Sequence, residues 1–230
     1  MQVFKDIEFE DVIDHEGQML CDYQCNRCSF VNAGILHREE SQKTPLNRAT
    51  LRNVELINCK AINAYLDGAI IEDVEVVDLK RGRSPIFLRA NAYKHVVFSG
   101  KTASLEIRGK LGVFDSSFDL IWDKANAEYY ETVDWALDIS EARYASLSIS
   151  GIPSRLIRRC EETTAVVTRE KALEGAWRKL AYNSGLFSIV INRLVDEGYN
   201  DVLLVACPES SRFADQMEDL EMLRNEGIAS

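Results

Sequence analysis

A five-residue period runs through residues 49–79 and constrains the fold more than any other feature of the sequence. Every fifth position is apolar in a first column: Ala49, Val54, Cys59, Ala64, Ala69, Val74 and Leu79. A second column is also apolar: Leu51, Leu56, Ala61, Leu66, Ile71 and Val76. A third column holds Asn53, Asn58, Asn63, Gly68, Asp73 and Asp78. Asn, Asp and Gly tolerate a left-handed backbone, so the chain is predicted to bend at every fifth residue.

This pattern resembles the pentapeptide-repeat family, and the matching segments are ATLRN, VELIN, CKAIN, AYLDG, AIIED and VEVVD, from Ala49 to Asp78. Weaker matches lie at residues 7–37 and 137–151. The resemblance implies a right-handed quadrilateral β-helix in which each repeat forms one side and the two apolar columns fill the axis. Each coil of such a stack buries its side chains only against neighbouring coils, so its ends require caps.

The sequence predicts a mainly β chain with two regions. We expect the β-helix over residues 1–152, with a loop insertion at 37–48 and an irregular course over 80–136. Residues 153–230 are expected to be mostly α-helical, because apolar residues recur at helical spacing. The predicted elements are a helix ending near Tyr182 with Val166, Leu173, Trp177 and Leu180 on one face, a helix over 186–197, a strand over 201–207 and a last helix that begins after Ser210 or Ser211. This region either caps the β-helix or forms a homodimer surface.

Composition and charge narrow the class of protein. The chain has 230 residues, 46% of them hydrophobic, and only four prolines, which is typical of an ordered globular protein. No stretch approaches the roughly 20 apolar residues of a membrane-spanning helix, and the N-terminus is acidic, so we expect a cytoplasmic protein without membrane attachment. The net charge of -10 has the wrong sign for direct nucleic-acid binding.

One segment opposes the overall charge. Residues 81–110 carry seven basic residues against a single acid, Glu106. A basic segment on an acidic body favours an interaction surface, and we select Arg81, Arg83, Arg89 and Lys94 as candidate partner-binding residues. In the alternative interpretation these side chains pair with acidic neighbours on either side.

Three cysteines have a spacing that is known from metal sites. Cys21, Cys25 and Cys28 form a C-x3-C-x2-C motif, which resembles the cluster motif of radical S-adenosylmethionine enzymes. A zinc site with His37 or Cys59 as fourth ligand is a second alternative. Cys25 and Cys28 fall on the inward columns of the local repeat, so we favour buried, reduced thiols and expect no metal and no cofactor.

Catalytic motifs are missing from the sequence. None of His15, His37 and His95 has a sequence partner that indicates a catalytic triad. Paired carboxylates serve some β-helical carbohydrate-active enzymes. Here two groups, Asp73, Glu75 and Asp78 and also Asp115, Asp119 and Asp123, are interpreted as bend or outer-face residues. No phosphate-binding loop or nucleophile elbow occurs.

These observations favour a non-catalytic protein-interaction module. Such a module would bind and modulate or neutralise a protein partner through acidic β-helix faces and the basic segment. A first alternative is a DNA mimic that protects gyrase, as some proteins of the resembling family do. A second alternative is an enzyme, either carbohydrate-active or dependent on a metal at Cys21, Cys25 and Cys28.

Overall fold

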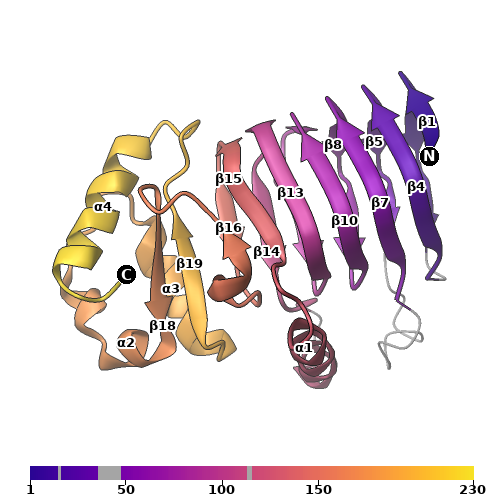
Figure 1. The fold of residues 1–230 in the computed structure, drawn as a ribbon. Helices are drawn as coiled ribbons and strands as arrows, with labels where there is room; N and C mark the ends of the chain where they lie inside the picture. Colours follow the sequence, from indigo (N-terminus) through magenta and orange to yellow (C-terminus); the bar gives the residue numbers. More distant parts are fainter. Residues whose placement is uncertain (15–16, 36–47, 113–115) are drawn as a thin grey trace.

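The computed structural model describes residues 1–14, 17–35, 48–112 and 116–230, and this part of the chain is mainly β with parallel sheets (Figure 1). Sheet A contains β1 (Gln2–Lys5), β4 (Met19–Asn26), β7 (Thr50–Ile57), β10 (Ile70–Val77), β13 (Ala92–Thr102), β15 (Leu137–Tyr144) and β17 (Ile157–Arg158). Sheet B contains β2 (Glu8–Glu10), β5 (Ser29–Val31), β8 (Lys60–Ile62) and β11 (Lys80–Arg81). Sheet C contains β3 (Ile13–Asp14), β6 (Gly34–Ile35), β9 (Tyr65–Asp67), β12 (Ile86–Arg89), β14 (Leu105–Arg108) and β16 (Leu147–Ile149), and then β19 (Asp201–Val205) and β18 (Thr164–Thr168).

The chain visits the sheets in a fixed order. As far as β12 it passes through sheet A, sheet B and sheet C in turn and then returns to sheet A. Ile70 pairs in register with Thr50 on one side and with Ala92 on the other. The strands of sheet A therefore lie side by side along the length of the molecule, as Figure 1 shows.

The backbone bends at the positions that the third column predicts. Asn53, Asn58, Asn63, Gly68, Asp73 and Asp78 all have positive φ angles, between 48° and 69°. Hydrogen bonds continue through these bends, since the amide of Asn58 donates to the Val77 carbonyl at 2.8 Å. The composition of this column is thus explained by the left-handed backbone that it must adopt.

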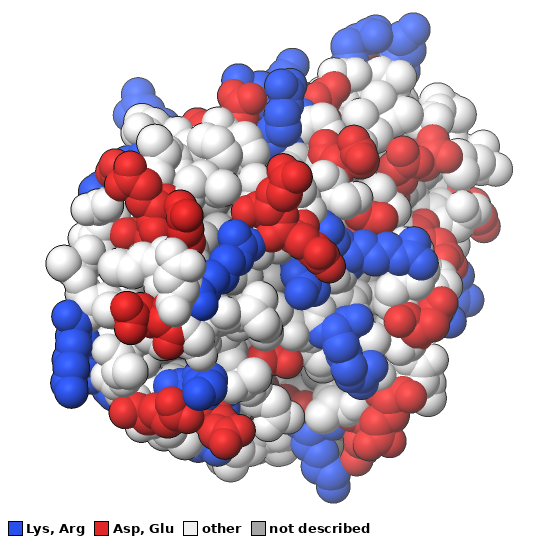
Figure 2. Space-filling model, turned by 60° about the vertical axis from the view of Figure 1, so that its left-hand side comes forward, with Lys and Arg blue, Asp and Glu red and all other residues white. Residues whose placement is uncertain are grey.

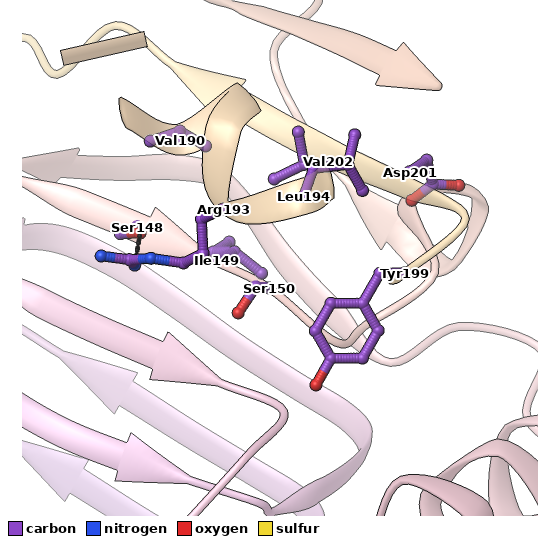
Figure 3. A pocket seen from close by; sticks show the side chains of 9 residues that line it. All are labelled: Ser148, Ile149, Ser150, Val190, Arg193, Leu194, Tyr199, Asp201 and Val202. Carbon is purple, nitrogen blue, oxygen red and sulfur yellow. Dashed lines mark hydrogen bonds between the residues drawn. The ribbon is translucent and has the colours of Figure 1, made fainter. Parts of the chain in front are cut away.

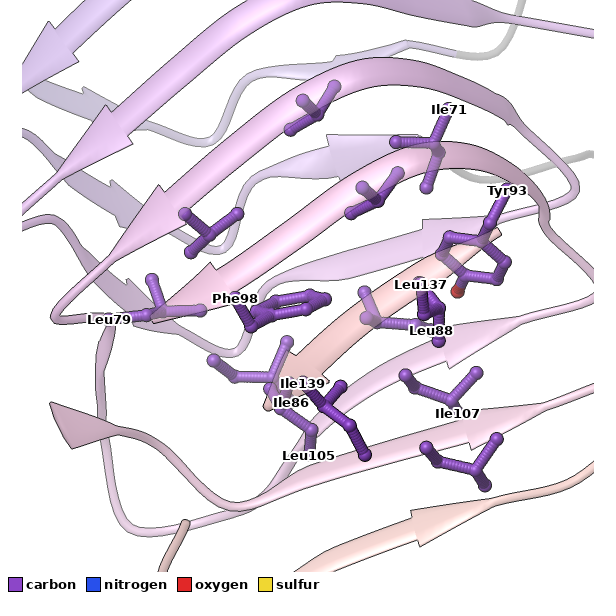
Figure 4. Packing of buried hydrophobic residues seen from close by; sticks show 14 of the residues in the cluster. Ile71, Leu79, Ile86, Leu88, Tyr93, Phe98, Leu105, Ile107, Leu137 and Ile139 are labelled. Carbon is purple, nitrogen blue, oxygen red and sulfur yellow. The ribbon is translucent and has the colours of Figure 1, made fainter. Parts of the chain in front are cut away.

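The two apolar columns fill the space between the sheets, as predicted. Val54, Val74 and Val96 pair in register on neighbouring strands and are buried. Figure 4 shows Phe98, Leu88 and Ile107 from three strands in the same cluster. Each layer of side chains contacts the layers before and after it, so burial accumulates along the stack.

Helix α1 (Ser116–Tyr130) is a departure from the expected irregular course over 80–136. It lies beside the stack in Figure 1, and Arg48 holds it there. The Arg48 guanidinium donates to the Asn126 side chain and lies over the Trp122 ring. Most of the expected loop at 37–48 falls outside the described residues.

The C-terminal region combines helices with an antiparallel pair of strands. α3 (Leu186–Glu197) matches its predicted bounds, and α4 (Phe213–Asn225) lies where the last helix was expected. The helix predicted to end near Tyr182 is wrong, because Val166 belongs to β18 and pairs with Leu203 of β19. Two shorter helical segments remain: α2 (Arg169–Glu174), which ends at Gly175 with φ 75°, and the 3-10 helix η3 (Ala176–Lys179), which contains Trp177.

This region is joined to the parallel sheets. β19 pairs with β16 through Ile149 and Leu203, so sheet C extends into the C-terminal region, and β17 continues sheet A beyond residue 152. Figure 3 shows Arg193 of α3 against Ser148 and Ile149, and the space that these residues line has no volume for a water molecule. No helix in the described part of the chain is long and apolar enough to span a membrane.

Candidate protein-binding surface

An outward row of side chains on sheet A is acidic. Gln24, Glu55, Glu75, Val97, Asp138 and Arg158 follow one another in register on β4, β7, β10, β13, β15 and β17, so the row carries three carboxylates and ends in a cation. They point outward because the side chains of a strand alternate and the adjacent residues, such as Val54 and Val74, are buried. The row therefore places carboxylates on rigid strands with a separation of about 4.8 Å per strand.

A second acidic row follows the neighbouring bend. Asp22, Asn53, Asp73 and His95 occupy the same bend on successive strands, and all have positive φ. The Asn53 amide donates to Asp22 at 2.5 Å, and His95 lies between Asp73 and Asp134. We define the acidic stripe as the carboxylates of both rows together with Asp134, which contacts His95: Asp22, Glu55, Asp73, Glu75, Asp134 and Asp138.

His95 is the basic group within the acidic stripe. Its Nδ1 lies 3.0 Å from Asp73 Oδ1 and its Nε2 lies 2.7 Å from Asp134 Oδ1. Only the protonated imidazole donates to both carboxylates at once. The hydrogen bond to His95 holds the pKa of Asp134 below its ordinary value. The ring also packs against Trp135, with a centroid distance of 4.7 Å and an angle of 33° between the ring planes.

A cation, Arg158 of β17, lies in register beside Asp138, and its guanidinium lies over the Trp135 ring. Within the described residues, no Lys or Arg forms an ion pair with any carboxylate of the acidic stripe. Arg52, which precedes the bend at Asn53, forms its ion pair with Glu72 at 2.6 Å instead. Figure 2 shows a contrasting face that includes the C-terminal end, where acidic and basic side chains are interspersed. The carboxylates of the acidic stripe thus lack a Lys or Arg ion pair within the described residues.

The candidate residues of the basic segment lie on different sheets. Arg81 is on β11 of sheet B and Arg83 follows it, whereas Arg89 ends β12 of sheet C and Lys94 is on β13 of sheet A. The structure brings Arg81 and Arg83 together, with the Arg81 Nη1 donating to the Arg83 carbonyl at 2.7 Å. It does not bring these two residues together with Arg89 and Lys94 on one face.

Arg89 has an acidic neighbour, as the alternative interpretation expected. Its guanidinium forms two hydrogen bonds to the Asp67 carboxylate, at 2.9 and 2.6 Å. Asp67 is buried, and burial raises its pKa despite the adjacent cation. Lys94 lies in register with Glu72. Arg89 is therefore held in an internal ion pair.

Two lysines that the sequence analysis did not select lie next to Arg81. Lys60 and Lys80 pair in register on β8 and β11, and both side chains are exposed. We define the basic patch as Lys60, Lys80, Arg81 and Arg83. The signal for this grouping was the separation of 20 residues between Lys60 and Lys80, which corresponds to four repeats.

The cysteines of the C-x3-C-x2-C motif are divided between the core and the outer surface. Cys25, Cys28 and Cys59 are buried, as the inward columns predicted, and the Cys59 thiol donates to the Cys25 carbonyl at 3.2 Å. Burial raises the pKa of Cys25 to about 12. Cys21 instead pairs in register with Arg52 on the outward side of sheet A. No group of His, Cys, Asp or Glu in the described ranges is arranged to hold a metal ion. His37 lies outside them.

The second group of carboxylates makes internal contacts on α1. Asp119 accepts from the amides of Leu111 and Gly112, and Asp123 accepts from the Tyr199 hydroxyl at 2.9 Å. Both residues therefore have structural partners, and Asp115 lies outside the described residues.

No protein-family model matches the chain, and no curated protein or solved structure is significantly similar to it.

Proposed function

We propose that residues 1–152 wind as a right-handed four-sided β-helix of the pentapeptide-repeat type. The left-handed residues at five-residue spacing support this proposal, because each marks a corner between two sides. The cyclic order of sheets A, B and C supports it as well. In this proposal the C-terminal region caps the stack, since β19 covers the end of sheet C beyond β16.

We infer that the protein is a non-catalytic interaction module, and the acidic stripe is the observation that carries this inference. Apart from Asp134, its carboxylates stand on paired strands, so little backbone freedom is lost when a partner binds. Within the described chain they form no ion pair with Lys or Arg, so a basic partner surface can supply the pairing charge. Complementary charge also accelerates association and selects against acidic partners.

The chemistry of the stripe indicates how the module acts. A protein whose basic surface is covered by the stripe loses access to its other acidic ligands. The module would thus modulate or neutralise its partner by occupancy. Where the covered surface normally holds DNA, the same occupancy amounts to DNA mimicry.

Affinity capture from the native lysate tests this function. The tagged protein is compared with Glu55→Lys/Glu75→Lys and with the control Glu221→Lys/Glu226→Lys, which makes the same charge change at exposed positions near the C-terminal end of α4. We expect a stoichiometric partner with the unmodified protein and the control, and its loss with the stripe variant. Equal recovery with both variants, or no partner at all, would contradict the proposal.

The same eluates distinguish the remaining functions. A DNA-binding enzyme as the captured partner would favour DNA mimicry. Stoichiometric iron or zinc in a preparation without partner would direct attention to Cys21, Cys25 and Cys28 as a metal site.

A further inference from the structure

We propose that the basic patch binds an acidic segment of a protein, through ion pairs from its carboxylates to Lys60, Lys80, Arg81 and Arg83. This inference rests on the proposed interaction function and adds a second surface, with a partner of opposite charge to that of the acidic stripe.

The patch is built by strand register. Lys80 lies directly beside Lys60, so the two side chains leave adjacent strands about 4.8 Å apart. Arg81 is folded back onto the following turn, where its Nη1 donates to the carbonyls of Gly82 and Arg83. Arg83 is exposed. Lys60 and Lys80 thus leave the outward side of sheet B, whereas Arg81 follows the buried Ala61 in register and reaches the same end of the sheet by folding over the turn.

These cations have no carboxylate partner in the described part of the chain. Other arginines do: Arg27 pairs with Asp6, Arg52 with Glu72 and Arg89 with Asp67. Like charges directly opposite each other on neighbouring strands are destabilising. The Lys60 and Lys80 pair therefore costs the fold free energy that an acidic ligand would return.

The position of the patch favours recognition by side chains. In the described chain sheet B ends at β11, while sheets A and C continue. β11 has only two residues, so it is too short to add a partner strand by backbone pairing. Ion pairs with lysine and arginine side chains are the interactions that this surface offers.

The overall charge selects the class of partner. A nucleic-acid duplex carries dense charge over a long distance and meets the repulsion of a protein with net charge -10. A short acidic segment responds mainly to charges within the Debye length of about 8 Å at physiological ionic strength. The patch therefore fits an acidic protein segment better than a nucleic acid.

Protection of the sheet edge is the competing explanation of the lysines. Charged side chains on edge strands prevent pairing between molecules. A glutamate at the same position would protect the edge equally well, so reversal of charge separates the two explanations.

The experiment measures fluorescence anisotropy of a labelled decaglutamate peptide with the full-length protein. Lys60→Glu/Lys80→Glu is compared with Arg169→Glu/Lys179→Glu, a control with the same charge change at exposed positions of the C-terminal region. We expect binding that weakens with added salt, at least tenfold weaker binding by the patch variant and a change within twofold for the control. Lys80→Glu alone should keep or raise the midpoint of thermal unfolding, because the introduced carboxylate faces Lys60.

Three results would overturn the proposal: no peptide binding by the unmodified protein, equal weakening in both double variants, or tighter binding of a labelled DNA duplex than of the peptide. If the peptide does not bind but a partner that depends on the acidic stripe is captured, the acidic stripe remains as the interaction surface. Only the proposal for the basic patch is then removed. If no stripe-dependent partner is captured but the peptide still binds, the basic patch remains as an interaction surface and the proposal for the acidic stripe is removed.

Discussion

The Arg48 guanidinium donates to the side-chain oxygen of Asn126 at 2.8 Å and so joins the segment that leads into β7 to α1. The same guanidinium donates to the carbonyls of Gly68, Ala69 and Ala90. Burial lowers the pKa of Arg48 to about 10. One cation thus satisfies acceptors on three separate parts of the chain.

Replacement of Arg48 by Met should lower the free energy of unfolding by about 2–4 kcal/mol, because several buried acceptors lose their donor. Arg48→Lys should recover little of this loss, since an ammonium lacks the planar fork that reaches several carbonyls. Urea unfolding followed by circular dichroism measures both variants. A loss below about 0.5 kcal/mol for Arg48→Met would show that Arg48 does not hold these elements.

The ion pair of Arg89 and Asp67 predicts a pH-dependent loss of stability. Arg89→Met leaves the Asp67 carboxylate buried without its cation, which should cost about 2–3 kcal/mol at pH 7.5. The pKa of Asp67, already raised by burial, then rises further above its unfolded value. The folded state keeps a proton that the unfolded state releases, so stability falls as pH increases through that interval.

Urea unfolding at pH 4.5 and 7.5 checks the direction of this pH dependence. The loss in free energy of unfolding caused by Arg89→Met should be smaller at pH 4.5 than at pH 7.5. The double variant Arg89→Met/Asp67→Asn is the control, because it has no carboxylate to titrate and its deficit should be the same at both pH values. A deficit of Arg89→Met that grows toward acid pH would contradict the assignment.

The left-handed bends predict a residue-specific response at Asn58, which is exposed and has φ 55°. Asn58→Val should destabilise the protein by about 1–2 kcal/mol, because a β-branched side chain collides with the backbone in this conformation. Asn58→Gly should stay within about 0.5 kcal/mol of the unmodified protein. Thermal unfolding compares the unmodified protein with both variants. Equal midpoints for Asn58→Val and Asn58→Gly would argue against a left-handed backbone that excludes β-branched residues at this position.

His95 should control the ionisation of Asp134. His95→Asn retains a residue that tolerates positive φ and removes the imidazole that hydrogen-bonds to Asp134, so the pKa of Asp134 should rise toward its ordinary range. In the unmodified protein the contact between His95 and Asp134 stabilises the fold at pH values above the ordinary aspartate pKa. This stabilisation is lost as the pH falls through the lowered pKa of Asp134. Carboxyl ¹³C titration by NMR measures the change. Asp6, whose pKa is lowered by Arg27, should titrate as before.

The cysteines should differ in reactivity. Hydrogen bonds from the Thr163 amide and hydroxyl lower the pKa of the partly exposed Cys160, while burial raises that of Cys25 to about 12. Iodoacetamide at pH 7.5 should therefore modify Cys160 at least about ten times faster than Cys25. Peptide mass spectrometry over time gives both rates. Comparable rates would mean that the stack opens around Cys25 under native conditions.

The sequence predicted the bends and the apolar columns well because both depend on local chemistry. Asn58 and Asp73 are chosen by a backbone angle, and Val54 and Val74 by burial in a regular layer. α1 was missed because its apolar pattern is weak: Leu120 is 67% exposed, whereas its Trp122 and Asn126 are fixed by Arg48, far away in the sequence. Val166 was assigned to a helix because its pairing with β19 is a tertiary contact that helical spacing does not reveal.

The candidate surfaces were predicted less completely for a related reason. Arg81, Arg89 and Lys94 are close in the sequence, but a chain that changes sheet every few residues distributes them over different sides. Lys60 and Lys80 are 20 residues apart and lie side by side. Charge counted along a continuous segment therefore misses surfaces that are formed between layers.

The parallel register from Thr50 to Ile70 gives this molecule a linear scale. A step of 20 residues along the chain there corresponds to one advance of about 4.8 Å along the stack, with the same side facing outward. A surface pattern can thus be shifted, lengthened or rewritten one layer at a time by exchanging whole blocks of sequence. Duplication of such a block would move everything beyond it by a single fixed increment, so the length of the body and the spacing of its charges can change without a new fold.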